Sequence, residues 1–211
     1  MTLIFYDYDR APSPRRARIL LAEKNVPHET VQIDMMKNAQ LSDEYRAINP
    51  ACTIPALKLE DGTVLTDNAG IAAYLEHAFP HPPLLGTTAV EKAEVASWNA
   101  KLEGAFLMGI ASAFRNTNPA MKNRALPGPH DYAQIPALAD RGMAQIDHFL
   151  AMFESHLEGR EFIAADHFTV ADVTGGVTLD FARVVGKRPG EEHRNIARWH
   201  AGLKERPSFQ L

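Results

Sequence analysis

A proline-rich segment divides the chain into two parts with different hydrophobic patterns. Residues 79–86 read Phe-Pro-His-Pro-Pro-Leu-Leu-Gly, with three prolines in eight positions, and proline interrupts both helices and central strands. Before this segment, short runs of β-branched and aromatic residues alternate with helical patterns; beyond residue 88 we find only helical periodicity. This change predicts a two-domain α+β protein, in which a mixed domain precedes an all-helical bundle.

The first part begins with a strand, a helix and a second strand. Residues 2–8 (TLIFYDY) are typical of a buried strand, and Val31 and Ile33 alternate with polar residues as in a second one. The residues between them have helical spacing, which predicts a parallel β-α-β unit with a right-handed crossover. The helix should turn an apolar face inward (Ala17, Leu20, Leu21, Lys24) and a charged face outward (Arg15, Arg16, Arg18, Glu23).

The rest of the first part completes a mixed domain over residues 1–78. A polar segment from residue 37 to 49 leads to a short strand at 54–59, and Asp61-Gly62 is a hairpin signal before the next strand at Val64. Asp67 or Asn68 can cap the following helix. The predicted order is β-α-β-α-β-β-α.

The second part, after a linker at 79–88, should be helical from residue 89 to 211. Periodic apolar residues predict long helices at 90–114 and 138–157, a third marked by Val170 to Val184 and a fourth marked by Ile196 to Leu203. The intervening stretch from 116 to 136 is rich in Pro, Gly and Asn, and is either a functional lid or a plain loop.

Composition excludes several classes of function. The net charge of −4 and the isoelectric point near 6.1 argue against nucleic acid or an anionic membrane as the main partner. There is no apolar run of 18 residues to span a membrane. One cysteine, Cys52, excludes an intrachain disulfide and fits a cytoplasmic location. Pro80 interrupts the helix between His77 and His81, so no metal site is predicted.

Five segments carry a resemblance to a known family, in the same order and spacing. Together they resemble the cytosolic glutathione S-transferase superfamily, including its bacterial members, nearly from end to end. The segments are Ser13–Lys24 (first helix), Asn49–Leu57 (strand with the family's cis-proline), Thr66–Leu75 (γ-glutamyl-binding segment), Phe168–Asp172 (buried capping box) and Arg198–Ser208 (terminal helix).

The resemblance implies a thioredoxin-like domain that binds glutathione and a helical domain that meets the second substrate. The expected activity is attack of the glutathione thiolate on a small hydrophobic electrophile, as in detoxification, with glutathione as a substrate and no metal. Glutathione-dependent reduction of peroxides or disulfides is an alternative on the same fold, and a non-catalytic binding or assembly module is another. Family members are usually homodimers.

The resemblance also implies the glutathione-binding residues. Ser13 would stabilise the sulfur, since a free thiol titrates near ~8.5 and needs donors to ionise at neutral pH. The Ile54 backbone next to a cis Pro55 would pair with the cysteinyl backbone. Asn68 would take the γ-glutamyl carboxylate at a helix N-terminus, and Asp67 the γ-glutamyl ammonium.

Each of these residues also has a structural interpretation. Ser13 lies just before the expected helix and could simply cap it, as Asp67 or Asn68 could cap theirs. Many members carry the catalytic serine where this chain has Ala11, so Tyr6, Tyr8 or backbone amides are further candidates for the thiolate donor.

The remaining candidates are less specific. Cys52 could form a mixed disulfide with glutathione or be a small buried residue. Thr169 and Asp172 form a capping box with a structural role, and the three arginines of the first helix should lie on a solvated or dimer-facing surface. An acceptor site should be lined by the first long helix and the loop after it; its candidates, which have helical spacing typical also of a core, are Phe106, Ile110, Phe114 and Arg115.

Overall fold

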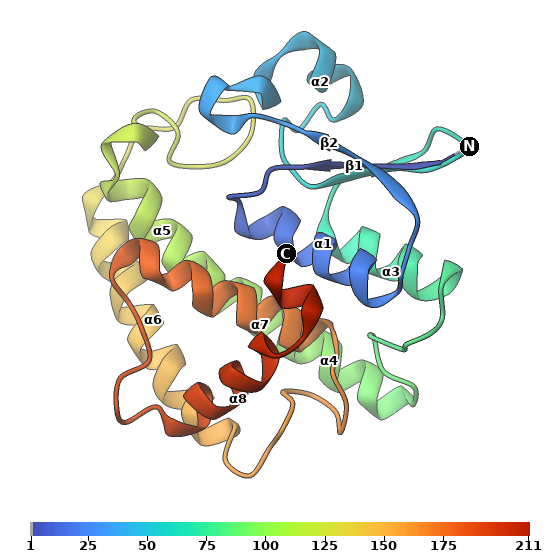
Figure 1. Cartoon of the computed structure of the whole chain (residues 1–211). Coiled ribbons are helices and arrows are strands. Elements are labelled where there is room, and N and C mark those ends of the chain that lie inside the picture. Colours follow the sequence, from blue (N-terminus) through green and yellow to red (C-terminus); the bar gives the residue numbers. More distant parts are fainter. Residues whose placement is uncertain (1) are drawn as a thin grey trace. The chain divides into compact units, whose positions relative to one another are not determined.

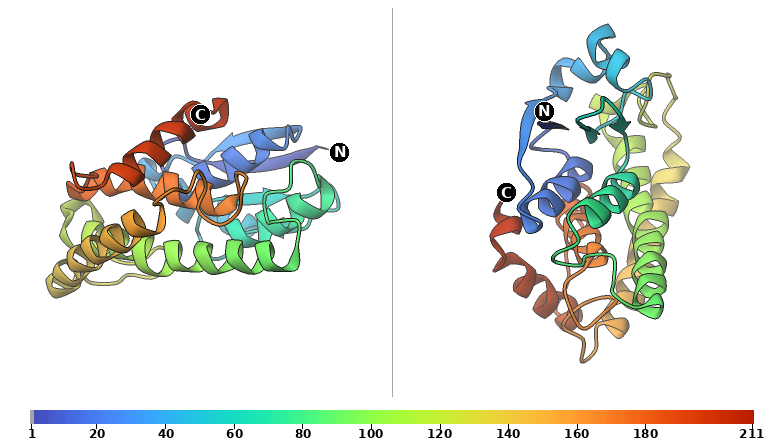
Figure 2. Two further views of the ribbon diagram at one scale, coloured as in Figure 1. Left: turned by 90° about the horizontal axis from the view of Figure 1, so that it is seen from below. Right: turned by 90° about the vertical axis from the view of Figure 1, so that its right-hand side faces the viewer.

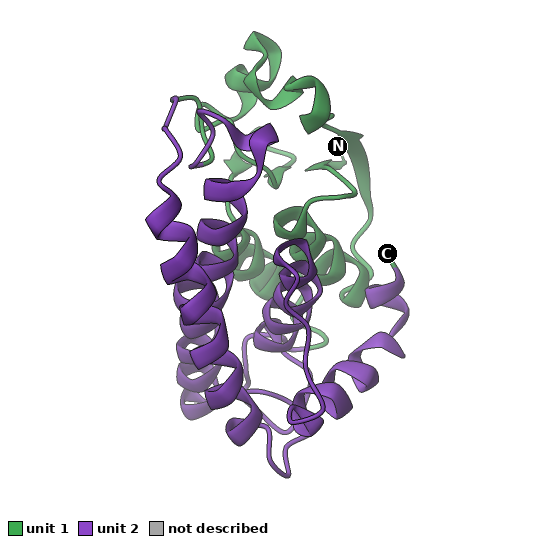
Figure 3. Ribbon diagram, turned by 90° about the vertical axis from the view of Figure 1, so that its left-hand side faces the viewer, with its two compact units in different colours: residues 1–82, 127–130, 211 green, residues 83–126, 131–210 purple. Residues whose placement is uncertain are grey.

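The structure, a computed structural model, describes residues 2–211 (Figure 1). The chain forms two compact units (Figure 3). Unit 1 consists of the chain up to Pro82 with Pro127–His130 and Leu211; unit 2 consists of Pro83–Leu126 and Asp131–Gln210. Unit 1 is mixed α/β and unit 2 is helical, so the predicted α+β fold class is confirmed.

Unit 1 follows the predicted order of elements. Its sheet has the strand order β2-β1-β3-β4, with β2 parallel to β1 and the other neighbours antiparallel. Helices α1 and α3 pack side by side (Figures 1 and 2). The elements are β1 (Leu3–Asp7), α1 (Pro12–Glu23), β2 (His28–Gln32), two 3₁₀ turns (Met35–Lys37, Ala39–Leu41), α2 (Asp43–Ile48), β3 (Ala56–Lys58), β4 (Val64–Leu65) and α3 (Asn68–Ala78).

The charged face expected on α1 is partly buried, which corrects the sequence analysis. Arg16 is only 7% exposed. Arg18 forms a two-pronged ion pair with Asp7 at the end of β1, with Nε–Oδ2 and Nη2–Oδ1 distances of 2.9 and 2.8 Å. The Asp7 side chain is buried and also accepts from the Gln32 amide. A buried carboxylate needs such donors, so α1 turns arginines toward the sheet as well as toward solvent.

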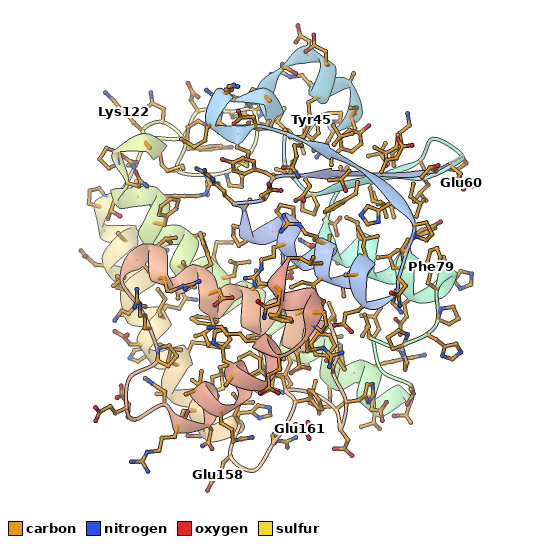
Figure 4. All side chains as sticks on the ribbon, in the orientation of Figure 1. Tyr45, Glu60, Phe79, Lys122, Glu158 and Glu161 are labelled. Atoms are coloured by element: carbon orange, nitrogen blue, oxygen red, sulfur yellow. The ribbon has the colours of Figure 1, made fainter. Side chains whose placement is uncertain are left out.

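Lys24 closes the C-terminal end of α3. Its side chain is 1% exposed, and its ammonium donates to the carbonyls of Phe79 (2.8 Å) and Pro82 (2.7 Å) and pairs with Glu76 at 2.8 Å. Phe79, labelled in Figure 4, directly follows the last residue of α3. The last carbonyls of a helix have no partner within it, so one lysine fixes where α3 ends.

Unit 2 contains four long helical segments. The first runs without a break from Ala89 to Thr117, but its middle is π-helical, which the sequence did not predict. The elements are α4 (Ala89–Lys101), the π-helical segment (Leu102–Leu107), α5 (Met108–Thr117), a 3₁₀ turn (Pro119–Met121), α6 (Pro136–His156), α7 (Val170–Phe181), a 3₁₀ turn (Ala182–Val185), α8 (Arg194–Lys204) and a last 3₁₀ turn (Pro207–Gln210). Val184, expected on the inner face of the third helix, lies beyond it and is exposed.

Two glycines let α5 and α6 approach each other closely. A Cβ atom added at Gly142 would lie 2.5 Å from the carbonyl oxygen of Gly109, and one added at Gly109 would lie 3.2 Å from the carbonyl oxygen of Gly142. Only hydrogen fits at Gly142, because real Cβ atoms do not come so near to a backbone oxygen. Beside this contact Phe106 stacks on Phe149 with ring centroids 4.8 Å apart.

The capping box at the start of α7 is fully buried, as the sequence predicted. Asp172 is 0% exposed and accepts four hydrogen bonds. Their donors are the Ile163 N–H (3.0 Å), the Thr169 N–H (3.0 Å), the Thr169 hydroxyl (3.2 Å) and the Trp199 indole N–H (3.0 Å). Burial raises the pKa of Asp172, and these donors oppose that rise. The carboxylate therefore fastens α7 to α8 and to the loop before α7.

Among residues 2–211, no helix is both long and apolar enough to cross a membrane. The same residues contain no group of three or more His, Cys, Asp or Glu side chains placed to hold a metal ion.

Candidate functional site

The N-terminal ends of α1 and α3 form the core of the candidate site. Helix α1 begins at Pro12 after Ala11, and no side chain of residues 2–211 caps it. Ser13 is therefore the second residue of the helix, which corrects the expectation that it precedes or caps α1. A helix N-terminus leaves amide donors without partners, and the Ser13 N–H forms no hydrogen bond within residues 2–211.

A side-chain hydrogen bond joins the two helix ends. The Asn68 amide nitrogen, Nδ2, donates to the Ser13 hydroxyl oxygen at 3.0 Å, across 55 positions of sequence. Asn68 is the first residue of α3 and is 8% exposed, whereas Ser13 is half-buried. The other side-chain atom of Asn68, Oδ1, is buried and has no partner in the part of the chain that the structure describes. Two sequence-predicted residues are thus brought together.

Asp67 is the N-cap of α3. Its Oδ1 accepts from the Gly70 N–H at 2.8 Å, and the side chain is exposed. The structural interpretation of this residue is therefore correct, and it leaves lone pairs of the carboxylate open to solvent. An exposed carboxylate beside open helix amides can hold a ligand that carries an ammonium and a carboxylate on neighbouring atoms.

The segment before β3 presents a backbone edge. The Ile54–Pro55 peptide is cis, as the resemblance implied. Within residues 2–211 neither the N–H nor the C=O of Ile54 forms a hydrogen bond. Such a free pair of backbone groups can accept an extended peptide in the manner of an added strand.

Two residues that sequence reasoning missed hold this edge in place. The Tyr45 hydroxyl and the Asn49 side-chain amide both donate to the Thr53 carbonyl at 2.7 Å. Burial raises the pKa of Tyr45 to about 12, so its hydroxyl stays protonated and remains a donor. Asn49 belongs to the Asn49–Leu57 segment that carries the family resemblance. Nothing in the sequence pattern around Tyr45, which Figure 4 labels, distinguishes it from an ordinary core aromatic.

The reserve candidates are structural. Tyr6 is 7% exposed and packs edge-on against Tyr45 with ring centroids 5.9 Å apart, and Tyr8 is half-buried against the same cluster. Cys52 is 2% exposed, with its sulfur 3.6 Å from the Pro50 carbonyl oxygen. Its φ of +54° lies in the left-handed region that glycine adopts most easily. Burial of its thiol favours the structural interpretation over a mixed disulfide.

The acceptor-site candidates separate into two groups. Phe106 and Ile110 are 0% exposed and belong to the core, which agrees with the structural interpretation of their helical spacing. Phe114 is half-buried and packs edge-on against Phe181. Arg115 donates from Nη1 to the Arg124 carbonyl at 2.8 Å. Burial lowers the pKa of the Arg115 guanidinium, and the charge of Arg124 lowers it further.

Both halves of the chain match known domain families. Residues 11–78 match the family "Glutathione S-transferase, N-terminal domain", and residues 136–202 match "Glutathione S-transferase, C-terminal domain".

Individual proteins match over almost the whole chain. Glutathione S-transferase 2 of Saccharomyces cerevisiae is 30% identical over 213 residues, covering 99% of this chain and 88% of its own. The crystal structure of Gtt2 from Saccharomyces cerevisiae aligns with a TM-score of 0.88 and 30% identity, covering 98% of each chain. A glutathione S-transferase of Methylobacillus flagellatus, solved with glutathione bound, has the same fold, with a TM-score of 0.82, 23% identity, and 99% and 98% of the two chains covered. By its sequence and by its fold, the chain belongs to the glutathione S-transferase superfamily.

Proposed function

We propose that this protein is a glutathione transferase that activates the glutathione thiol for attack on a small hydrophobic electrophile. The observation that carries the proposal is the Asn68–Ser13 hydrogen bond, which places a serine hydroxyl between two helix N-termini. The glutathione bound in the Methylobacillus relative supports the choice of ligand.

Each part of glutathione has a matching group in unit 1. The γ-glutamyl carboxylate would lie at the N-terminal amides of α3, including that of Asn68, and the ammonium would pair with Asp67. The free backbone groups of Ile54, next to Pro55, would bind the cysteinyl backbone. The sulfur would then accept from the Ser13 hydroxyl and from the Ser13 N–H, which together favour the thiolate over the thiol.

The reaction needs no further cofactor. The thiol proton passes to solvent, and the thiolate sulfur donates an electron pair to the electrophilic carbon. A new C–S bond forms while the bond to the leaving group breaks, and the leaving group departs with its electrons. The protein contributes orientation and stabilisation of the thiolate. On the acceptor side we propose Phe114 and Arg115.

We further propose a cytoplasmic homodimer that acts in detoxification, as family members do. Light scattering checks the assembly, for which a mass of one chain would contradict the dimer.

The test of the function is titration of glutathione by calorimetry, followed by assay with a chlorinated nitrobenzene, a peroxide and a mixed disulfide. We expect wild type to bind glutathione at micromolar to millimolar concentration and to turn over the chlorinated substrate. Turnover of the peroxide or disulfide alone would instead favour the reductase alternative. Absence of glutathione binding would leave the fold as a binding or assembly module.

A serine pair tests the residue that carries the proposal. Ser13→Ala should keep binding and lose most of the turnover. The matched control is Ser42→Ala in the same unit, because the Ser42 hydroxyl caps α2 by accepting from the Tyr45 N–H at 3.2 Å and has no place in the candidate site. Equal turnover by the two variants would remove Ser13 from the mechanism.

A further inference from the structure

Asn68 has one side-chain atom engaged and one without a partner. Nδ2 donates to Ser13 Oγ at 3.0 Å, while Oδ1 is buried and accepts nothing within residues 2–211. The side chain is held at the first position of α3 and is 8% exposed. A buried amide oxygen without a hydrogen-bond partner destabilises the folded protein. Folding alone therefore does not explain why Asn68 uses its Nδ2 to donate to Ser13 and leaves Oδ1 without a partner.

The direction of the hydrogen bond determines what the Ser13 hydroxyl can do. A serine hydroxyl has one hydrogen to donate and two lone pairs that accept. Since Asn68 supplies the hydrogen of the shared bond, it occupies a lone pair and leaves the Ser13 O–H unused. No other group among residues 2–211 takes that hydrogen. The O–H is therefore available to a group that is not part of the protein.

We propose that Asn68 is a positioning residue for the thiolate: by donating to Ser13 Oγ it directs the serine O–H to the glutathione sulfur. This inference rests on the proposed function. It assigns Asn68 a role through Ser13, in addition to the contact of its backbone amide with the γ-glutamyl carboxylate.

The proposal predicts opposite behaviour for an acceptor at the same position. In Asn68→Asp the side chain keeps its shape but can only accept, so the Ser13 hydrogen turns toward position 68 and is lost to the sulfur. In Asn68→Ala the hydroxyl rotates without constraint. The negative charge of the aspartate also acts on the sulfur directly, so Asn68→Asp alone does not isolate the role of Ser13. Asn68→Ala is therefore measured both in the wild-type background and in the Ser13→Ala background.

The experiment follows the ultraviolet absorbance of the thiolate of bound glutathione against pH. Measurements use wild type, Asn68→Ala, Asn68→Asp, Ser13→Ala, and the double variant of Ser13→Ala with Asn68→Ala. The control is Asn195→Ala. Asn195 is also an asparagine in the first turn of a helix, and its Nδ2 donates to the Glu154 carbonyl at 3.3 Å in unit 2. Melting temperatures are recorded for all of them.

We expect the apparent pKa of the bound thiol to rise by about one unit in Asn68→Asp, which is about a tenfold smaller ratio of thiolate to thiol at a given pH. Asn68→Ala should raise it in the same direction. Ser13→Ala should raise it too, and adding Asn68→Ala should produce no further rise, because both changes remove one interaction. Asn195→Ala should match wild type whatever its melting temperature.

Two results overturn the inference by different routes. If wild type binds no glutathione, the proposed function and this inference fall together. If wild type lowers the thiol pKa but the Asn68 variants lower it equally, or if the Ser13 and Asn68 changes add in full, Asn68 does not act through Ser13 and only this inference falls.

Discussion

The N-terminal ends of α3 and α7 both carry a capping aspartate, but they differ in how many hydrogen-bonding groups remain without a partner among residues 2–211. The N-cap residue of each helix has an oxygen-bearing side chain, Asp67 at α3 and Thr169 at α7. At each end an aspartate carboxylate accepts from backbone N–H, Asp67 at α3 and Asp172 at α7. At α7, Asp172 is buried and receives four donors. At α3, Asp67 is exposed, and Asn68 Oδ1 and the Ile54 backbone groups have no partner within residues 2–211.

This difference separates a structural cap from the cap that we propose binds glutathione. A folded protein pairs nearly all of its buried polar groups, so the hydrogen-bonding capacity left unused at α3 is better explained by a ligand than by folding. At the N-terminus of α7, both carboxylate oxygens of Asp172 already accept hydrogen bonds from the protein. Substitutions at the two ends should therefore affect different properties of the molecule, stability at α7 and glutathione affinity at α3.

The largest expected effect is on stability, from Asp172→Ala. Four donors around Asp172 would lose their acceptor, which should lower the free energy of unfolding by about 4 kcal/mol. Urea unfolding followed by circular dichroism measures this loss. Asp172→Asn should cost less, because its remaining oxygen still accepts from the Ile163 and Trp199 N–H groups that face Oδ1. A loss of less than about 1 kcal/mol for the alanine variant would contradict the structural role.

The next effect concerns the other end of α3, where the Lys24 ammonium donates to backbone carbonyls. Lys24→Met would leave the carbonyls of Phe79 and Pro82 unpaired and should lower the free energy of unfolding by about 2 to 3 kcal/mol. The control is Lys37→Met, because the Lys37 side chain is 84% exposed and pairs with Asp34 only at 3.4 Å. That change should stay within about 0.5 kcal/mol. Equal losses would mean that the buried lysine is not what closes α3.

Asp67→Ala should have a smaller effect on stability and a decisive one on binding. Loss of the cap should cost about 1 kcal/mol, while calorimetry should detect no glutathione binding. Asp61→Ala is the matched control, since Asp61 is also exposed and accepts from a backbone N–H, that of Thr63, at 2.9 Å. It should bind glutathione as wild type does. If Asp67→Ala bound glutathione as tightly as wild type, the cap of α3 would be structural in the same way as the cap of α7.

The smallest effect is a pH dependence of stability that should arise in unit 2. Burial lowers the pKa of His156, whose ring stacks on Trp98 with centroids 3.8 Å apart and whose Nε2 lies 2.7 Å from the Ile163 carbonyl oxygen. The unfolded chain takes up the proton near ~6.5, and the folded chain takes it up only at lower pH. The contribution of His156 is therefore present above that pH and lost as pH falls through the folded value.

Thermal melts of wild type and His156→Gln at mildly alkaline and mildly acidic pH check this sign. The difference between their melting temperatures should narrow on acidification. His130→Gln, at an exposed position, serves as the control. A difference that stays constant or widens would contradict the assignment.

The order of the elements was predictable, whereas the burial of several side chains was not. Hydrophobic periodicity and turn residues indicated the strands of unit 1 and its helices α1 and α3 in order, and the capping box of α7, whereas the polar segment that contains α2 carried no such signal. The burial of the α1 arginines does not follow from the sequence, because a helical pattern does not show that Asp7, eleven residues before Arg18, ends the neighbouring strand as a buried carboxylate. Phe106 and Ile110 have a spacing that a core and a binding surface share, so only the folded structure could assign them.

In the site, the residues were predictable and their connections were not. The resemblance implies Ser13, Asp67 and Asn68, but it does not show that α1 begins at Pro12, which makes Ser13 the second residue of that helix. The Asn68–Ser13 hydrogen bond spans 55 positions and follows from the packing of α1 on α3. The support of Thr53 by Tyr45 likewise depends on tertiary structure.

The close contact of Gly109 with Gly142 bears on how a protein of this kind changes over evolutionary time. Because backbone meets backbone there, the spacing of α5 and α6 does not depend on the size of any side chain at that contact. Residues on the outer surfaces of these helices can then be exchanged by drift or selection without altering the spacing of the pair. A substitution on those outer surfaces would then change substrate contacts or stability only at the substituted residue. A substitution at Gly142 would instead push the two helices apart, because its Cβ would meet the Gly109 carbonyl oxygen.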